Sequence, residues 1–128
     1  MRHLGIDYGE KRMGLALSDP EGIIAMPYET IANSKSIAGD IAAIVKKEDV
    51  KKIVVGIPIT FSGGESRQTK SVKEFAEDLR NVVGIPVDFE NELLTTRLAE
   101  REGVPKEHLD KAAAALILQS YLDKKVKK

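Results

Sequence analysis

Cysteine is missing from the 128-residue chain, which excludes a disulfide scaffold, a thiol nucleophile and a cysteine-ligated zinc site. Histidine is nearly missing as well, because His3 and His108 alone are too few for a histidine-rich metal site. Neither sign of charge is in excess, since 20 Lys and Arg balance 20 Asp and Glu. Any polyanion must therefore be bound by a local patch and not by an overall basic field.

Long apolar runs and aromatic residues are also scarce. The longest apolar run, Ala112–Leu118, is far shorter than the ~20 residues of a membrane span, and no signal-peptide core precedes Asp7. We therefore expect a cytoplasmic protein that does not bind membranes. Aromatic residues make up 5% of the chain and form no recognisable stacking platform, which disfavours recognition of single-stranded bases.

The order of apolar segments predicts one α/β domain over residues 1–128. It predicts a mixed sheet covered by helices on both faces, with an opening hairpin and with Pro27 favouring either an edge position or a bend for the third strand. The predicted strands are His3–Gly9, Gly14–Ser18, Ile23–Thr30, Lys52–Ile57 and Ile85–Glu90. The predicted helices are Ile37–Val45, Val72–Val83, Thr95–Glu102 and Leu109–Asp123, with a loop at Thr60–Thr69 and a frayed basic tail at residues 124–128.

Three acidic residues stand where chemistry is expected. Asp7 lies in a strand that is predicted to be internal, on the side opposite to Leu4 and Ile6, although an aspartate there also suits a cap for the next turn. Glu92 follows the last strand, where a solvated loop glutamate is the simpler interpretation. Asp110 opens the final helix on its apolar face; the helix dipole favours an acid in the first turn but does not explain that face.

If these carboxylates converge, they need a cation. Two like charges ~4 Å apart repel by about 4 kcal/mol at an effective dielectric constant near 20, so such a cluster persists only when protonated or when it binds a cation. Oxygen ligands without cysteine favour Mg²⁺ or Mn²⁺. A carboxylate-held pair of such ions suits the in-line attack of water on a phosphodiester.

Four segments resemble the YqgF/RuvX family, whose members are described as Holliday junction resolvases and as pre-16S rRNA nucleases. Gly5–Asp19 resembles the N-terminal signature, and Val54–Pro58 with the following glycine-containing loop resembles the central motif. Glu92–Thr96 resembles the Asp-Glu-Arg-Leu-Thr-Thr segment, and Asp110–Gln119 resembles the closing Asp-x-x-Ala-Ala-x-x-Ile-Leu-Gln motif. The segments occur in the family's order and cover essentially the whole chain.

The resemblance implies an RNase H-like fold, a five-stranded mixed sheet whose first three strands are antiparallel. It also implies that Asp7, Glu92 and Asp110 are the catalytic, metal-binding acids of a hydrolase that cuts structured nucleic acid. Two positions depart from the family pattern, because Asn91 replaces an aspartate and Leu93 replaces an arginine. Asn91 is a weaker metal ligand, and the loss of the arginine removes one phosphate contact.

Candidate contacts to the nucleic-acid backbone flank these acids. They lie in the first hairpin turn, at the start of the helix after Gly63-Gly64, and just after Glu92. Taken singly, each also fits a solvated surface residue. The candidates are Lys11, Arg12, Arg67, Thr69, Lys70, Thr95, Thr96 and Arg97.

Several functions remain open. The leading hypothesis is an endonuclease that uses Mg²⁺ or Mn²⁺ to process the 5′ end of precursor 16S rRNA, with a Holliday junction resolvase as the alternative. A resolvase should be a two-fold dimer, and the sequence specifies neither a monomer nor a homodimer. A phosphotransferase of the actin or sugar-kinase type shares an Asp-x-Gly after its first strand but needs two such domains. A non-catalytic nucleic-acid-binding factor would explain Asn91 and Leu93.

Overall fold

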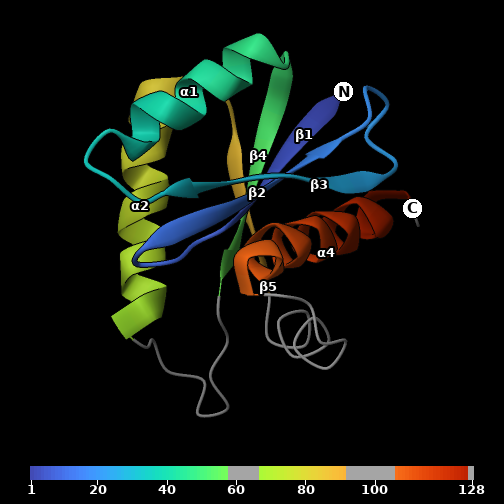
Figure 1. Cartoon of the computed structure of the whole chain (residues 1–128). Coiled ribbons are helices and arrows are strands. Elements are labelled where there is room, and N and C mark those ends of the chain that lie inside the picture. Colours follow the sequence, from blue (N-terminus) through green and yellow to red (C-terminus); the bar gives the residue numbers. More distant parts are fainter. Residues whose placement is uncertain (58–66, 92–105, 127–128) are drawn as a thin grey trace.

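The computed structural model describes residues 1–57, 67–91 and 106–126, which form a five-stranded sheet with helices on both faces (Figure 1). The strand order β3-β2-β1-β4-β5 places β1 at the centre. The strands are β1 (Arg2–Asp7), β2 (Arg12–Ser18), β3 (Ala25–Ala32), β4 (Val50–Ile57) and β5 (Val87–Asn91). The helices are α1 (Ile37–Lys47), α2 (Arg67–Val83) and α4 (Lys106–Val126).

The pairing of the strands is mixed, as the sequence predicted. β1, β2 and β3 are antiparallel neighbours, whereas β4 pairs parallel to β1 and β5 pairs parallel to β4. β3 lies at the edge, where Pro27 faces Ala16 beside a register shift between Leu15 and Ala16. Proline has no N–H to donate to a ladder, which accounts for both the edge position and the irregular register.

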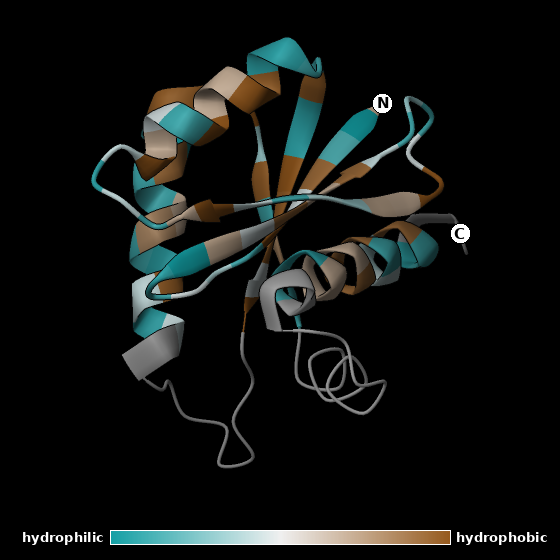
Figure 2. Ribbon diagram, in the orientation of Figure 1, coloured by the Kyte–Doolittle hydropathy of each residue, from teal (hydrophilic) through white to brown (hydrophobic). Residues whose placement is uncertain are grey.

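Helices α1 and α2 cover one face of the sheet over the larger core. Leu4 and Ile6 of β1 point to this side, together with Ile53 and Val55 of β4, and all four are fully buried. Figure 2 shows hydrophobic segments at the middle of the sheet, where β1 and β4 lie side by side. Because side chains alternate between the two faces of a strand, the intervening residues of β1 and β4 face α4 on the other side.

Helix α4 covers the other face at short range because small residues lie beneath it. Val54, Ala16, Ala114 and Leu118 form a separate buried cluster on this side. A Cβ atom built on Gly5 would lie 2.7 Å from the Leu118 Cβ atom, so only glycine permits this approach. The helix backbone is therefore held close to the strand that carries Asp7.

Polar contacts fix the C-terminal half of α4. The Tyr121 hydroxyl donates to Asp88 of β5 and accepts a hydrogen bond of 3.0 Å from Lys52 of β4. Lys124 pairs with the buried Glu90 at 2.8 Å. These contacts tie α4 to β4 and β5 and set its direction across the sheet.

Several boundaries differ from the sequence prediction. Residues 67–69, predicted in a loop, belong to α2, β3 begins at Ala25 and not at Ile23, and α4 begins at Lys106 and not at Leu109. Arg12 and Met13, predicted in the hairpin turn, belong to β2, because the turn is shorter than expected. The last helix runs through Val126 and not to Asp123, since Lys124 gains its partner on β5. The helix predicted at Thr95–Glu102 lies outside the described residues. No helix within the described ranges has the length and apolar character needed to cross a membrane.

Candidate metal centre

Gly14 brings Asp7 and Asp110 together. Asp7 is the register partner of Gly14 across the β1–β2 ladder, and such partners have Cα atoms ~4.5–5.5 Å apart. A Cβ atom built on Gly14 would overlap the main-chain carbonyl group of Asp110 and would lie 2.7 Å from the Lys111 nitrogen. The main chain of Asp110 in α4 therefore packs directly on Gly14, the residue that lies opposite Asp7 in the sheet.

The spacing along β1 and α4 leads to the same placement. Gly5 contacts α4 at Ala114, and Asp7 lies two residues further on the same face of β1. Two strand residues span ~6.6 Å, and the four helical residues from Ala114 back to Asp110 span ~6 Å. Because α4 runs antiparallel to β1, Asp7 and Asp110 lie at the same level along the two elements.

Arg12 adds a cation to this pair of acids. Its Nε atom donates to the Oδ2 atom of Asp110 at 2.5 Å, and the side chains are 41% and 25% exposed respectively. Arg12 and Gly14 occupy alternate positions of β2, so both face α4. Asp7 is half-buried and has an interaction partner of its own.

The ends of three parallel strands meet at this edge of the sheet. Ile6 pairs with Val55, and Ile57 pairs with Asn91, the last residue of β5. Asn91 is exposed at this edge. Glu92, the next residue, lies outside the described residues, and so does its predicted role.

The described acids suit a hard cation, although they do not complete a site. Asp7 and Asp110 offer carboxylate oxygens, the ligands that Mg²⁺ and Mn²⁺ prefer, and Arg12 already places a positive group on Asp110. Within residues 1–57, 67–91 and 106–126, no group of three or more His, Cys, Asp or Glu could hold a metal ion. The described residues therefore supply two of the three predicted acids, and the prediction for Glu92 lies outside them.

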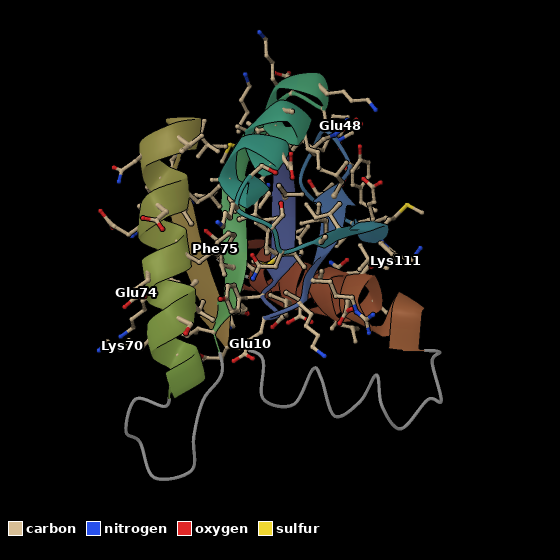
Figure 3. The ribbon with its side chains drawn as sticks, turned by 60° about the vertical axis from the view of Figure 1, so that its left-hand side comes forward. Glu10, Glu48, Lys70, Glu74, Phe75 and Lys111 are labelled. Atoms are coloured by element: carbon tan, nitrogen blue, oxygen red, sulfur yellow. The ribbon has the colours of Figure 1, made fainter. Side chains whose placement is uncertain are left out.

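The predicted substrate contacts are placed unequally. Lys11 is exposed in the β1–β2 turn, and Lys70 is exposed on the first half of α2. Figure 3 shows Lys70 at the same end of the molecule as Glu10 of that turn. Thr69 is only 6% exposed and has an internal partner, so its hydroxyl does not face the solvent. The side chain of Arg67 and residues Thr95, Thr96 and Arg97 lie outside the described part of the structure.

Sequence reasoning passed over Gly14, the residue that organises the centre. The signal was present, because a glycine inside a strand pattern marks a close approach of another backbone. Gly9 has a related role in the turn, where a Cβ atom would overlap the carbonyl oxygen of Arg12. Glycine thus sets the positions of both Arg12 and Asp110.

Comparison with known proteins identifies the family. A family model described as "RuvX: Holliday junction resolvase" matches residues 1–124. The chain belongs to the RuvX family. A relative from Caldanaerobacter subterraneus subsp. tengcongensis is 47% identical, with 96% of this chain and 96% of the relative covered. A relative from Syntrophus aciditrophicus is 45% identical, with 96% and 89% covered, and both relatives are named "Putative pre-16S rRNA nuclease".

Solved structures confirm the RNase H-like fold expected for this RuvX-family chain. Thermus thermophilus RuvC in complex with a Holliday junction superposes with a TM-score of 0.65 at 15% identity, covering 100% of this chain and 97% of RuvC. The fowlpox virus Holliday junction resolvase superposes with a TM-score of 0.61 at 12% identity, covering 97% and 99%. At these identities the likeness concerns the fold alone.

Proposed function

We propose that this RuvX-family protein is a divalent-metal-dependent endonuclease that processes the 5′ end of precursor 16S rRNA, and that residues 1–128 act as one nuclease domain. The observation that carries the proposal is the meeting of Asp7 and Asp110 at Gly14. Two acids on a covered sheet repel each other and lose hydration, so their proximity is favourable when they share a cation. The names of the relatives support the choice of an RNA precursor.

The proposed ligands are Asp7 and Asp110, with Glu92 as the third acid and Mg²⁺ or Mn²⁺ as the ion. When bound, such ions activate water and stabilise charge on the phosphate during in-line displacement. The protein itself contributes position. Asp7 is held by the central strand and Asp110 by a helix pressed onto Gly14, so the backbones that carry the two carboxylates are fixed relative to each other.

Basic side chains around this centre are proposed to orient the substrate backbone. Lys11 and Lys70 are exposed at the end of the molecule where the β1–β2 turn lies. The other candidates from the sequence are Arg67, Thr95, Thr96 and Arg97. The formal net charge of +0 gives no general attraction for nucleic acid, so binding must depend on this local group. Recognition by backbone and shape suits a structured RNA.

A Holliday junction is the second candidate substrate, because the matching family carries that description. Symmetric cutting of a junction requires a two-fold dimer, whereas cutting one RNA strand does not. The oligomeric state in the presence of each substrate therefore separates the two functions.

Cleavage of a labelled panel tests the proposal. The panel holds a precursor 16S leader, a four-way DNA junction and a linear duplex, each incubated in Mg²⁺ or Mn²⁺ with wild type and with Asp7→Asn. We expect cleavage of the leader at a defined position by the wild type and none by the variant. Cleavage of the junction alone would replace the RNA assignment. Equal binding by both proteins without any cleavage would indicate a non-catalytic factor.

A further inference from the structure

Arg12 and a divalent cation compete for one carboxylate. The Arg12 guanidinium donates to Asp110 Oδ2, the same residue that is proposed to ligate the ion. An oxygen engaged in a charge-assisted hydrogen bond is a poorer metal ligand. The guanidinium and the ion also repel, and a double charge repels a unit charge twice as strongly as another unit charge does.

Arg12 is placed so that it can leave Asp110 at little cost. It is the first residue of β2, beside the exposed turn that carries Lys11, and 41% of its side chain is exposed. Ion pairs at this exposure contribute little to stability. A guanidinium also binds phosphate oxygens well, through two parallel hydrogen bonds.

We propose that Arg12 leaves Asp110 and binds a phosphate of the nucleic acid when substrate is present. The protein then reaches its full affinity for the divalent cation only when substrate is bound. The exchange with phosphate rests on the proposed nuclease function, whereas the competition rests on the observed ion pair and on the proposed role of Asp110 as a metal ligand. Because coupling between two binding sites is reciprocal, the cation must also strengthen nucleic-acid binding through Arg12.

The opposite role for Arg12 makes an opposite prediction. A group that only orients a metal ligand strengthens metal binding, and its loss weakens metal affinity by ~10–100-fold. Competition instead predicts that removal of the guanidinium strengthens metal binding. The sign of the change in metal affinity therefore distinguishes the two roles.

The experiment titrates Mn²⁺ into the whole protein without nucleic acid and measures free Mn²⁺ by electron paramagnetic resonance. Arg12→Gln should lower the Kd for Mn²⁺ by about five-fold, which is equivalent to about 1 kcal/mol. Lys111→Gln is the matched control, since it removes the same charge next to Asp110 without touching the ion pair, and should change the Kd by less than about two-fold. Arg12→Lys keeps the charge and should stay near the wild-type value.

A second arm measures the coupling. The Kd of a labelled precursor 16S stem is determined by anisotropy with and without Ca²⁺, which takes the same oxygen ligands, at constant ionic strength. Ca²⁺ should strengthen stem binding about five-fold more in wild type than in Arg12→Gln.

The outcomes separate cleanly. If Mn²⁺ affinity is unchanged or weaker in Arg12→Gln, the competition is overturned. If Mn²⁺ affinity rises equally in Lys111→Gln, the specific role of Arg12 is also overturned, because the effect then follows from the loss of any nearby positive charge. Strengthened Mn²⁺ binding with wild-type coupling overturns the exchange with phosphate. Failure of the nuclease function shows instead as a wild type that neither binds nor cuts the stem. Circular dichroism melting verifies that each variant is folded. Arg12→Met, which also removes the guanidinium but keeps a long unbranched side chain, is the second variant if Arg12→Gln does not fold, and the same fall in Kd of about five-fold is expected for it.

Discussion

Replacing Gly14 by alanine adds a single methyl group at the point where α4 meets β2. The added Cβ atom would overlap the Asp110 carbonyl group and approach the Lys111 nitrogen to 2.7 Å, whereas ordinary contacts lie at 3.4–4 Å. The clashing atoms are main-chain atoms of α4 and cannot rotate away. The part of α4 around Asp110 and Lys111 must therefore recede from β2 by about 1 Å, and Asp110 moves away from Asp7 with it.

This displacement has two calculable consequences. Forcing extra volume into a packed contact costs ~1–3 kcal/mol of folding stability, which lowers the Tm of a domain of this size by about 3–15 °C. A misplacement of ~1 Å at a catalytic group costs ~100-fold in rate. Because the proposed contacts Lys11 and Lys70 lie outside both β2 and α4, we expect kcat to fall by about 100-fold and KM to change far less.

The assay compares single-turnover cleavage of the precursor 16S leader by wild type and Gly14→Ala well below both melting temperatures. Gly39→Ala is the control, because no atom lies within 4 Å of the added methyl in α1. It should raise stability by ~0.5–1 kcal/mol and leave cleavage unchanged. A Gly14→Ala protein with wild-type activity and stability would refute the packing of α4 on β2 as described.

Three further predictions concern stability and binding. Tyr121→Phe should lower the free energy of unfolding by about 1–2 kcal/mol. Burial, together with the hydrogen bond to Asp88, raises the pKa of Tyr121, so the higher Tm of the wild type should persist to pH ~10 and decline above it. Asp19→Ala should lower the Tm, because it removes the carboxylate that accepts hydrogen bonds from the Ile24 and Ile23 N–H groups. These bonds lower the pKa of Asp19, so the difference in Tm between wild type and variant should be largest above pH ~4 and should shrink as the pH falls through the pKa of the folded state. The Kd for the RNA stem should rise steeply with salt, and Lys70→Gln should reduce the slope of log Kd against log salt by about 1, whereas a flat salt response would remove the phosphate contacts.

Much of the fold follows from local signals in the sequence. The alternation of Leu4 and Ile6 with Gly5 and Asp7 assigned the two faces of β1, and Pro27 marked an edge strand. The predicted end of a helix at Val83 is also correct, and Gly84, the next residue, adopts a φ of 67°, which glycine tolerates best. These predictions succeed because each depends on neighbouring residues and on periodicity alone.

The centre itself could not be derived in this way. Asp7 and Asp110 are far apart in the chain, and their meeting depends on the register of β1 with β2 and on the level at which α4 crosses. The sequence predicts Arg12 in the hairpin turn, before the apolar residues resume at Gly14, and only its pairing with Ala32 of β3 shows that β2 begins at Arg12. Its ion pair with Asp110 joins residues from the two ends of the chain, which no local pattern predicts.

The most direct test of the proposed centre is the single-turnover cleavage rate of the precursor 16S leader in Mg²⁺ for wild type, Asp7→Asn, Asp110→Asn and Asp78→Asn. Asp78 is an exposed carboxylate on α2 outside the proposed centre, so its variant controls for the loss of one negative charge. We predict that Asp7→Asn and Asp110→Asn each lose at least about 100-fold in rate while remaining folded and able to bind the RNA, and that Asp78→Asn matches wild type. Wild-type cleavage by either folded variant at the proposed centre would contradict its assignment.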